Sequence, residues 1–174
     1  MKIDFSNLSE DIIPIDQFRL KNRFVQKELD TLPKQHLDQL KPLGKAGSRF
    51  LWDYTIQSEL HANAPFKKDF FTIVDKAKIV EGKEKETKKW LYKRGFQFDK
   101  LVFLSWQPTE AMIVPWKLLV KYFSHFYYCT SGDLTVIDQS LNWALLFYHE
   151  DEMYFGTNAK YEVLETEFSS SMSW

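Results

Sequence analysis

Residues 133–156 show the clearest pattern of apolar and polar positions in the chain. Three short segments rich in β-branched and aromatic residues alternate there with polar breaks at residues 138–140 and 150–152. This pattern predicts an antiparallel meander of three strands. The middle segment, Trp143 to Tyr148, is apolar at every position. We therefore expect other elements to cover both faces of the sheet.

Two more strands and a helix are expected just before the meander. Residues 101–106 (LVFLSW) are typical of a buried strand, and residues 111–114 form a second one after a polar break. Pro115 suits the first turn of a helix, where its missing N–H needs no partner. The helix over residues 115–127 carries one apolar stripe. We expect it to cover one face of the sheet.

The N-terminal half shows mainly helical periodicity. The pattern predicts helices over residues 16–29, 33–42, 48–60 and 82–95. Gly95 suits the left-handed position after the last of them. The chain thus predicts an α+β fold. A mostly helical N-terminal half packs on a C-terminal antiparallel sheet of four or more strands, with a covering helix at about residues 115–127.

The length of 174 residues fits one domain. Residues 1–15 are expected to form an N-terminal arm. Residues 158–174 are expected to form a loosely attached tail, because the last residues are rich in serine.

Charge and cysteine content exclude several classes of protein. The net charge is -1, so nothing supplies a general attraction to nucleic acid or to an anionic membrane. A single cysteine, Cys129, excludes an internal disulfide framework. The longest apolar run, residues 143–148, is far too short to span a membrane. We therefore expect a cytoplasmic protein that binds neither nucleic acid nor membrane. The oligomeric state stays open.

No complete catalytic or metal-binding motif is present, and no cofactor is expected. His149-Glu150 begins like the zinc motif His-Glu-x-x-His, but position 153 is methionine. Cys129 follows His125 by four residues, and such a pair can form a reactive thiolate. The aromatic residues between them favour a buried, inert cysteine instead.

Two charged groups are candidate binding surfaces. Glu150, Asp151 and Glu152 place three carboxylates on one tight turn. They either meet a basic partner or a divalent ion, or face water and keep the sheet edge from pairing with another chain. Lys117, Lys121 and His125 fall four residues apart and form a basic stripe on the predicted 115–127 helix, with Lys117 and Lys121 as the candidate binding residues. That stripe is either an anion site or simply the solvated side of the helix.

The aromatic segments of residues 48–157 resemble an uncharacterised bacterial family of unknown function. The segments that carry this resemblance are FLWDYTIQSEL, VFLSW, AMIVPWKLLVKYFSHFYY, DLTVID, NWALLFYHE and MYFG. The closing W…FYHE…YFG pattern is also similar, more loosely, to small bacterial immunity-type proteins. That resemblance implies a protein that binds and neutralises a toxin.

Two functions follow from these observations. The first is a non-catalytic protein-binding module, of which an immunity-like protein is one form, and its acidic turn and neighbouring aromatic residues contact a partner. The alternative is a small-molecule-binding protein or enzyme with an aromatic pocket that uses His149, Glu150 or Cys129.

Overall fold

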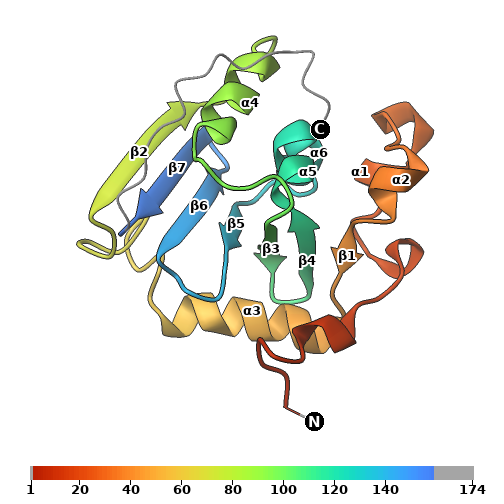
Figure 1. Cartoon of the computed structure of the whole chain (residues 1–174), viewed down its shortest axis with the longest axis horizontal. Coiled ribbons are helices and arrows are strands. Elements are labelled where there is room, and N and C mark those ends of the chain that lie inside the picture. The colour runs from red at the N-terminus through yellow and green to blue at the C-terminus, as the bar shows by residue number, and fades with distance from the viewer. Residues whose placement is uncertain (1, 159–174) are drawn as a thin grey trace.

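The apolar segments of the C-terminal half form the centre of a seven-stranded antiparallel sheet in the computed structural model, which describes residues 2–158 (Figure 1). The strand order is β1-β4-β3-β5-β6-β7-β2. The strands are β1 (Lys41–Pro42), β2 (Ile73–Lys78), β3 (Leu101–Gln107), β4 (Glu110–Pro115), β5 (Leu134–Ile137), β6 (Trp143–Tyr148) and β7 (Glu152–Thr157). The predicted meander is confirmed as β5, β6 and β7, and so is the α+β fold class.

Six α-helices and three 3-10 helices accompany the sheet in the described part of the chain. They are η1 (Leu8–Asp11), η2 (Ile15–Gln17), α1 (Asn22–Val25), η3 (Lys27–Leu29), α2 (Lys34–Leu37), α3 (Lys45–Gln57), α4 (Glu84–Tyr92), α5 (Trp116–Lys121) and α6 (Phe123–Tyr127). The covering helix predicted at about 115–127 is present as α5 and α6. Tyr122, with φ -116° and ψ 30°, separates the two. The predicted 82–95 helix is α4, and Gly95 adopts the expected positive φ of 81°.

The predicted helix over residues 16–29 is wrong. The chain forms the short pieces η2, α1 and η3 there. Phe18 and Phe24 both enter the main core and are 3% and 0% exposed. Six residues apart, they would point about 120° away from each other on one α-helix. Breaking the helix allows both rings to be buried on the same side.

The helix predicted to start at Ser48 begins earlier, at Lys45, and Gly44 precedes it. Ser48 lies inside α3, where its buried hydroxyl donates to the carbonyl of Leu43 at 3.3 Å. The residues expected as an N-terminal arm contact the fold, since Leu8 is 1% exposed and packs with Leu43. The predicted tail lies outside the described residues, apart from Asn158.

Helices cover both faces of the sheet, as the apolar β6 segment predicts. Figure 1 shows α3 on one side of the strands and α4, α5 and α6 on the other. We call these sides the α3 face and the α5 face. Leu145 of β6 points into the main core under α5 and α6, whereas Leu146 belongs to the smaller cluster on the α3 face. Consecutive residues of a strand alternate between faces in this way.

Among the helices of residues 2–158, none combines the length and the hydropathy that a membrane crossing requires.

Candidate functional site

The acidic turn joins β6 to β7 and is held in place from α6. Asp151 adopts a left-handed conformation with φ 60°. Its backbone N–H donates to the Tyr127 hydroxyl at 3.0 Å, and that hydroxyl lies 3.0 Å from Asp151 Oδ1 and 2.7 Å from the carbonyl oxygen of Tyr148. Burial and the neighbouring carboxylate raise the pKa of Tyr127, so its hydroxyl stays protonated. The turn is therefore rigidly connected to the core.

Glu150 and Glu152 border one shallow cavity, whereas Asp151 borders a different groove. Glu152 pairs with Lys76 of β2, with 2.5 Å between Nζ and Oε2, and this bond lowers the pKa of Glu152. Glu150 is exposed and lines a shallow cavity of about 190 Å³. Asp151 opens instead into a groove on the opposite side of the turn. The structure therefore does not gather Glu150, Asp151 and Glu152 into one charged cluster.

We call the groove beside Asp151 the acidic groove. It has a volume of about 500 Å³ and lies between the β6–β7 turn, the start of α4 and the end of α6. The residues that line it include the carboxylates Glu81, Glu84 and Asp151, the exposed side chains Val80 and Tyr128, and Arg23. Three carboxylates thus face one guanidinium group across a surface that also offers apolar area.

Tyr128 forms the exposed aromatic wall of the acidic groove. Its side chain is 47% exposed, and the Arg23 guanidinium carbon lies 5.8 Å from the centre of its ring. Burial raises the pKa of Tyr128, and the charges of Asp151, Glu81 and Glu84 raise it further. The same carboxylates would favour a cation brought into the groove by a partner.

The start of α4 fixes one of these carboxylates. Glu84 Oε1 accepts a hydrogen bond from the backbone N–H of Gly82 at 3.1 Å. Hydrogen bonds from its own backbone N–H and from that of Gly82, just before the helix, lower the pKa of Glu84. A carboxylate here also complements the positive end of the helix dipole. Glu84 is therefore ionised and held in position.

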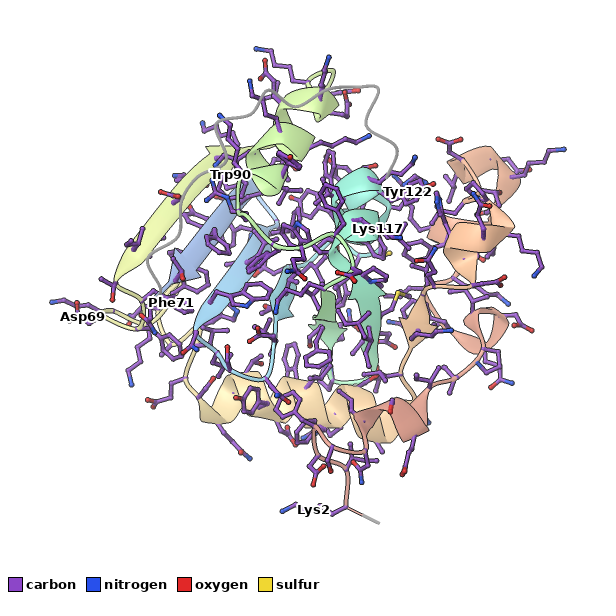
Figure 2. The ribbon with its side chains drawn as sticks, in the orientation of Figure 1. Lys2, Asp69, Phe71, Trp90, Lys117 and Tyr122 are labelled. Atoms are coloured by element: carbon purple, nitrogen blue, oxygen red, sulfur yellow. The ribbon has the colours of Figure 1, made fainter. Side chains whose placement is uncertain are left out.

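The predicted basic stripe does not line the acidic groove. Lys121 Nζ lies 5.8 Å from the ring centre of Tyr122, which bonds to His36, and Figure 2 labels Lys117 and Tyr122 together on this part of the molecule. Burial lowers the pKa of His36, and the charges of Lys121 and Lys117 lower it further. His125, the third member of the stripe, is buried, because the helix breaks at Tyr122. The charges of the two lysines thus act on His36 of α2, and that of Lys121 also acts on Lys88 of α4, while neither lysine lines the acidic groove.

The residues proposed for an enzymatic pocket make separate contacts. His149 Nδ1 lies 2.9 Å from Asp133 Oδ1. The Cys129 thiol donates to the carbonyl of His125 at 2.9 Å, and burial raises its pKa to about 12. A thiol with such a pKa is not a nucleophile near neutral pH. None of the five main cavities joins His149, Glu150 and Cys129.

The described residues also form no candidate metal site. Within residues 2–158 no three His, Cys, Asp or Glu side chains lie close enough together to hold an ion.

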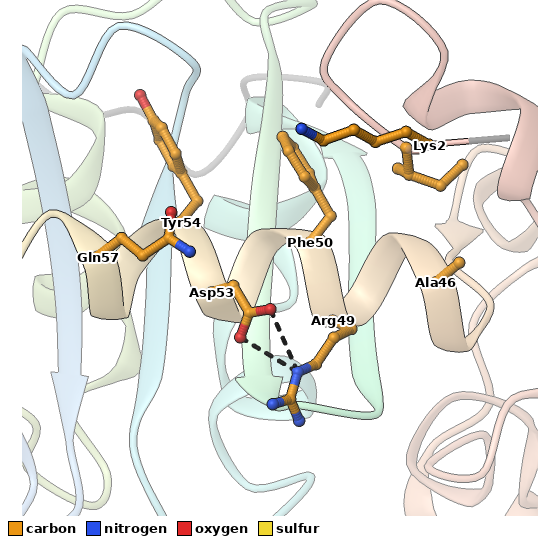
Figure 3. Close-up of a pocket in the computed structure, with 8 residues that line it drawn as sticks. Lys2, Ala46, Arg49, Phe50, Asp53, Tyr54 and Gln57 are labelled. Atoms are coloured by element: carbon orange, nitrogen blue, oxygen red, sulfur yellow. Dashed lines mark hydrogen bonds and ion pairs between the residues drawn. The ribbon is translucent and has the colours of Figure 1, made fainter.

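An open cavity of about 450 Å³ lies on the outer side of α3 (Figure 3). Its two charged groups from the helix neutralise each other, since Arg49 Nε lies 3.1 Å from Asp53 Oδ1. Tyr54, on the same side, donates its hydroxyl to the carbonyl of Gln139 at 2.7 Å. These polar groups are already engaged within the protein, so this cavity is a weaker candidate than the acidic groove.

Sequence reasoning missed Glu81, Glu84 and Tyr128 as parts of one surface. The two glutamates are explained locally by their place at the start of a helix, and Tyr128 by its place at the end of another. Only the tertiary packing brings Asp151 next to them. No signal in the one-dimensional pattern links residues 81–84 to residue 151.

No protein-family model, no curated protein and no solved structure matches this chain. The resemblance to an uncharacterised bacterial family and the looser one to immunity-type proteins therefore stay predictions.

Proposed function

We propose that the protein is a non-catalytic protein-binding module whose acidic groove receives a basic segment of a partner protein. The observation that carries the proposal is the arrangement of Glu81, Glu84 and Asp151 around the exposed ring of Tyr128. An exposed tyrosine is a common anchor of protein interfaces, and surrounding carboxylates select a cationic partner. The partner segment would place a lysine or arginine between the carboxylates and an apolar side chain on Val80 and Tyr128.

This function agrees with what the loose resemblance to immunity-type proteins implies, which is neutralisation of a partner by binding. It also agrees with the separate contacts of His149, Glu150 and Cys129, which offer no assembled catalytic group. The proposal keeps the cytoplasmic location that composition and the single cysteine indicate. It moves the binding surface from the tip of the acidic turn, at Glu150, to the groove beside Asp151.

Short peptides that combine Lys or Arg with a bulky apolar residue test the proposal. We expect them to bind the wild-type protein, as measured by calorimetry, and to bind more weakly as salt concentration rises. The triple variant Glu81→Gln, Glu84→Gln, Asp151→Asn should lose affinity by about tenfold or more, because an exposed ion pair contributes up to ~1 kcal/mol. Asparagine tolerates the left-handed backbone at position 151, so the turn should survive.

The control variant is Asp69→Asn with Glu86→Gln. Asp69 also has a left-handed backbone, with φ 62°, and Glu86 also lies in the first turn of α4, but neither lines the acidic groove. The control carries two fewer negative charges and should bind the peptides within about twofold of wild type, since neither carboxylate lines the groove and exposed charges are screened by salt. Equal binding by the triple variant and the wild type would refute the proposed surface.

A further inference from the structure

A second cavity, of about 270 Å³, lies between the C-terminal half of α3 and the sheet. Its floor is a row of three side chains, Ser105 of β3, Thr135 of β5 and Leu146 of β6, which are register partners across the sheet. On the opposite face the neighbouring positions hold Leu104 and Val136, both fully buried in the main core. The cavity exists because two small polar side chains stand where large apolar ones would fill the space under α3. We call it the α3 cavity.

The hydroxyl of Ser105 has no hydrogen-bond partner among the described residues. Ser105 lines the α3 cavity and is 4% exposed, and its Oγ atom is buried. Burying a hydroxyl without a partner costs on the order of 1–3 kcal/mol. Buried polar groups of native proteins are nearly always paired with protein, water or ligand. Ser105 therefore marks a place where the protein is prepared for a group that it does not itself supply.

The neighbouring hydroxyl, Thr135, is already engaged. His61 Nδ1 lies 2.6 Å from the carbonyl oxygen of Pro65 and must donate to it, because a carbonyl oxygen only accepts. His61 Nε2 then carries the lone pair and accepts the Thr135 hydroxyl at 2.9 Å. Burial lowers the pKa of His61, so the ring is neutral near pH 7. The imidazole thus fixes one side of the cavity and brings no positive charge into it.

The charge of the α3 cavity is negative. Asp133, at its mouth, is the one lining residue with a charged side chain, since His61 is neutral. The backbone N–H and Nδ1 of His149 both contact Asp133 Oδ1, at 2.8 and 2.9 Å. Within residues 2–158 no hydrogen bond to Asp133 Oδ2 is seen. That oxygen is available to a ligand.

The remaining walls are apolar and aromatic. They come from Trp52 and Ile56 of α3 and from Leu146. Trp106 also borders the cavity, but its ring packs in the main core and donates its N–H to the carbonyl of Phe126. Indole rings attract cations as well as apolar groups. The volume lies just below the usual range of about 300–1,000 Å³ for small-molecule sites, so a nucleotide or a peptide would not fit.

We propose that the α3 cavity binds a small primary ammonium compound with an apolar or aromatic body. The ammonium group donates to Asp133 Oδ2 and, once the buried Ser105 side chain turns toward the cavity, to its hydroxyl oxygen. The body packs against Trp52, Ile56 and Leu146. A primary ammonium fits because it supplies several donors and one positive charge, which are what the unpartnered oxygen atoms and the single carboxylate require. This site is separate from the acidic groove and does not depend on the function proposed for that groove.

Phenethylamine and isobutylamine are suitable cationic probes, with 2-phenylethanol and phenylacetate as neutral and anionic counterparts. Titration of the ¹⁵N-labelled full chain should shift the indole N–H signal of Trp52 and the backbone signals of Ser105 and Thr135. We expect at least one amine to bind about tenfold more tightly than 2-phenylethanol, the factor for one hydrogen bond between charged groups. If neither amine shifts these signals, the hydroxyl needs only a water molecule and the proposal is overturned. If 2-phenylethanol binds as tightly as phenethylamine, the proposed charge recognition is wrong.

Two variants distinguish a loss of amine binding from a loss of protein stability. Asp133→Asn keeps an oxygen acceptor for His149 but loses the charge, and should weaken amine binding by about tenfold. Ser105→Val fills part of the cavity and should abolish binding while the thermal midpoint holds or rises. Undiminished amine binding by Ser105→Val would place the amine elsewhere and overturn the proposal. The groove variant Glu81→Gln, Glu84→Gln should bind the amines like wild type, so that failure at one site is distinguished from failure at the other.

Discussion

Small residues interrupt the α3 face of the sheet at two places. A neighbouring side chain fills the space at one place, and a cavity remains at the other. At Gly156 of β7 the ring of Phe71 occupies the space, and a Cβ atom added there would lie 2.1 Å from Phe71 Cδ2. At Ser105 and Thr135 no side chain enters, and the α3 cavity is left. A small residue in a strand therefore does not by itself indicate a cavity. A cavity forms only where no neighbouring segment places a side chain in the space. At Gly156 the segment before β2 places Phe71 there, and Figure 2 labels this residue.

The largest effect should come from truncating the leucines at positions 145 and 146 of β6. Leu145 is fully buried in the dense core of the α5 face, whereas Leu146 borders the α3 cavity. Leu145→Ala should lower the free energy of unfolding by about 3–5 kcal/mol, and Leu146→Ala by about 2 kcal/mol, because fewer packed atoms are lost beside an existing space. Urea unfolding of both variants measures the difference. Equal costs would show that the α3 cavity is closed in solution.

Adding carbon atoms at the two small positions should have opposite results. Gly156→Ala must displace the Phe71 ring and should destabilise the protein by about 1–3 kcal/mol, the usual cost of overpacking. Ser105→Val places its extra methyl groups in the α3 cavity and should leave stability unchanged or raise it. Thermal unfolding of the two variants tests this. A large loss of stability in Ser105→Val would mean that the space beneath α3 is already filled.

The sequence predicts only part of the difference between the packing at Gly156 and the packing at Ser105 and Thr135. Alternating residues indicate the meander and its two covered faces, because a period of two is a local property of a strand. The serine within LVFLSW and the threonine within DLTVID are visible as polar residues in apolar strands. Their meaning depends on which of them become neighbours, and the pairing of Ser105 with Thr135 is set by the sheet register.

The same limit applies to the acidic turn. Three successive carboxylates predict an exposed turn, and that prediction is confirmed for Glu150 and Asp151, which are exposed. The contact of Asp151 with Tyr127 requires α6 to lie against the β6–β7 turn. The sequence separation of these two residues leaves no local pattern from which the contact could be predicted.

Acidification should weaken the α3 side of the molecule through His61. Burial lowers its pKa below the ordinary value of 6.5, so the folded state resists protonation while the unfolded chain takes up a proton. Stability should therefore be highest above pH 6.5 and fall as pH drops below it. His36 behaves in the same direction, because its pKa is also lowered. Denaturant midpoints at about pH 7.5 and about pH 5.5 should differ more for wild type than for His61→Gln. If the midpoints at the two pH values differ as much in His61→Gln as in wild type, the pH dependence of stability comes from His36 alone.

The smallest effect is expected from removing single hydroxyl groups. It is the most direct test of whether the Ser105 hydroxyl lacks a hydrogen-bond partner. Ser48 and Ser105 are both buried serines, but Ser48 donates to the Leu43 carbonyl at 3.3 Å whereas Ser105 has no partner in the described residues. Ser48→Ala should cost about 1 kcal/mol, the net value of a buried hydrogen bond. Ser105→Ala should be neutral or stabilise the ligand-free protein by up to about 1 kcal/mol, since it removes an unpaired polar group. Urea unfolding of both variants in the same buffer gives the comparison. A loss in Ser105→Ala equal to that in Ser48→Ala would mean that the Ser105 hydroxyl is already paired, by water or by a retained ligand.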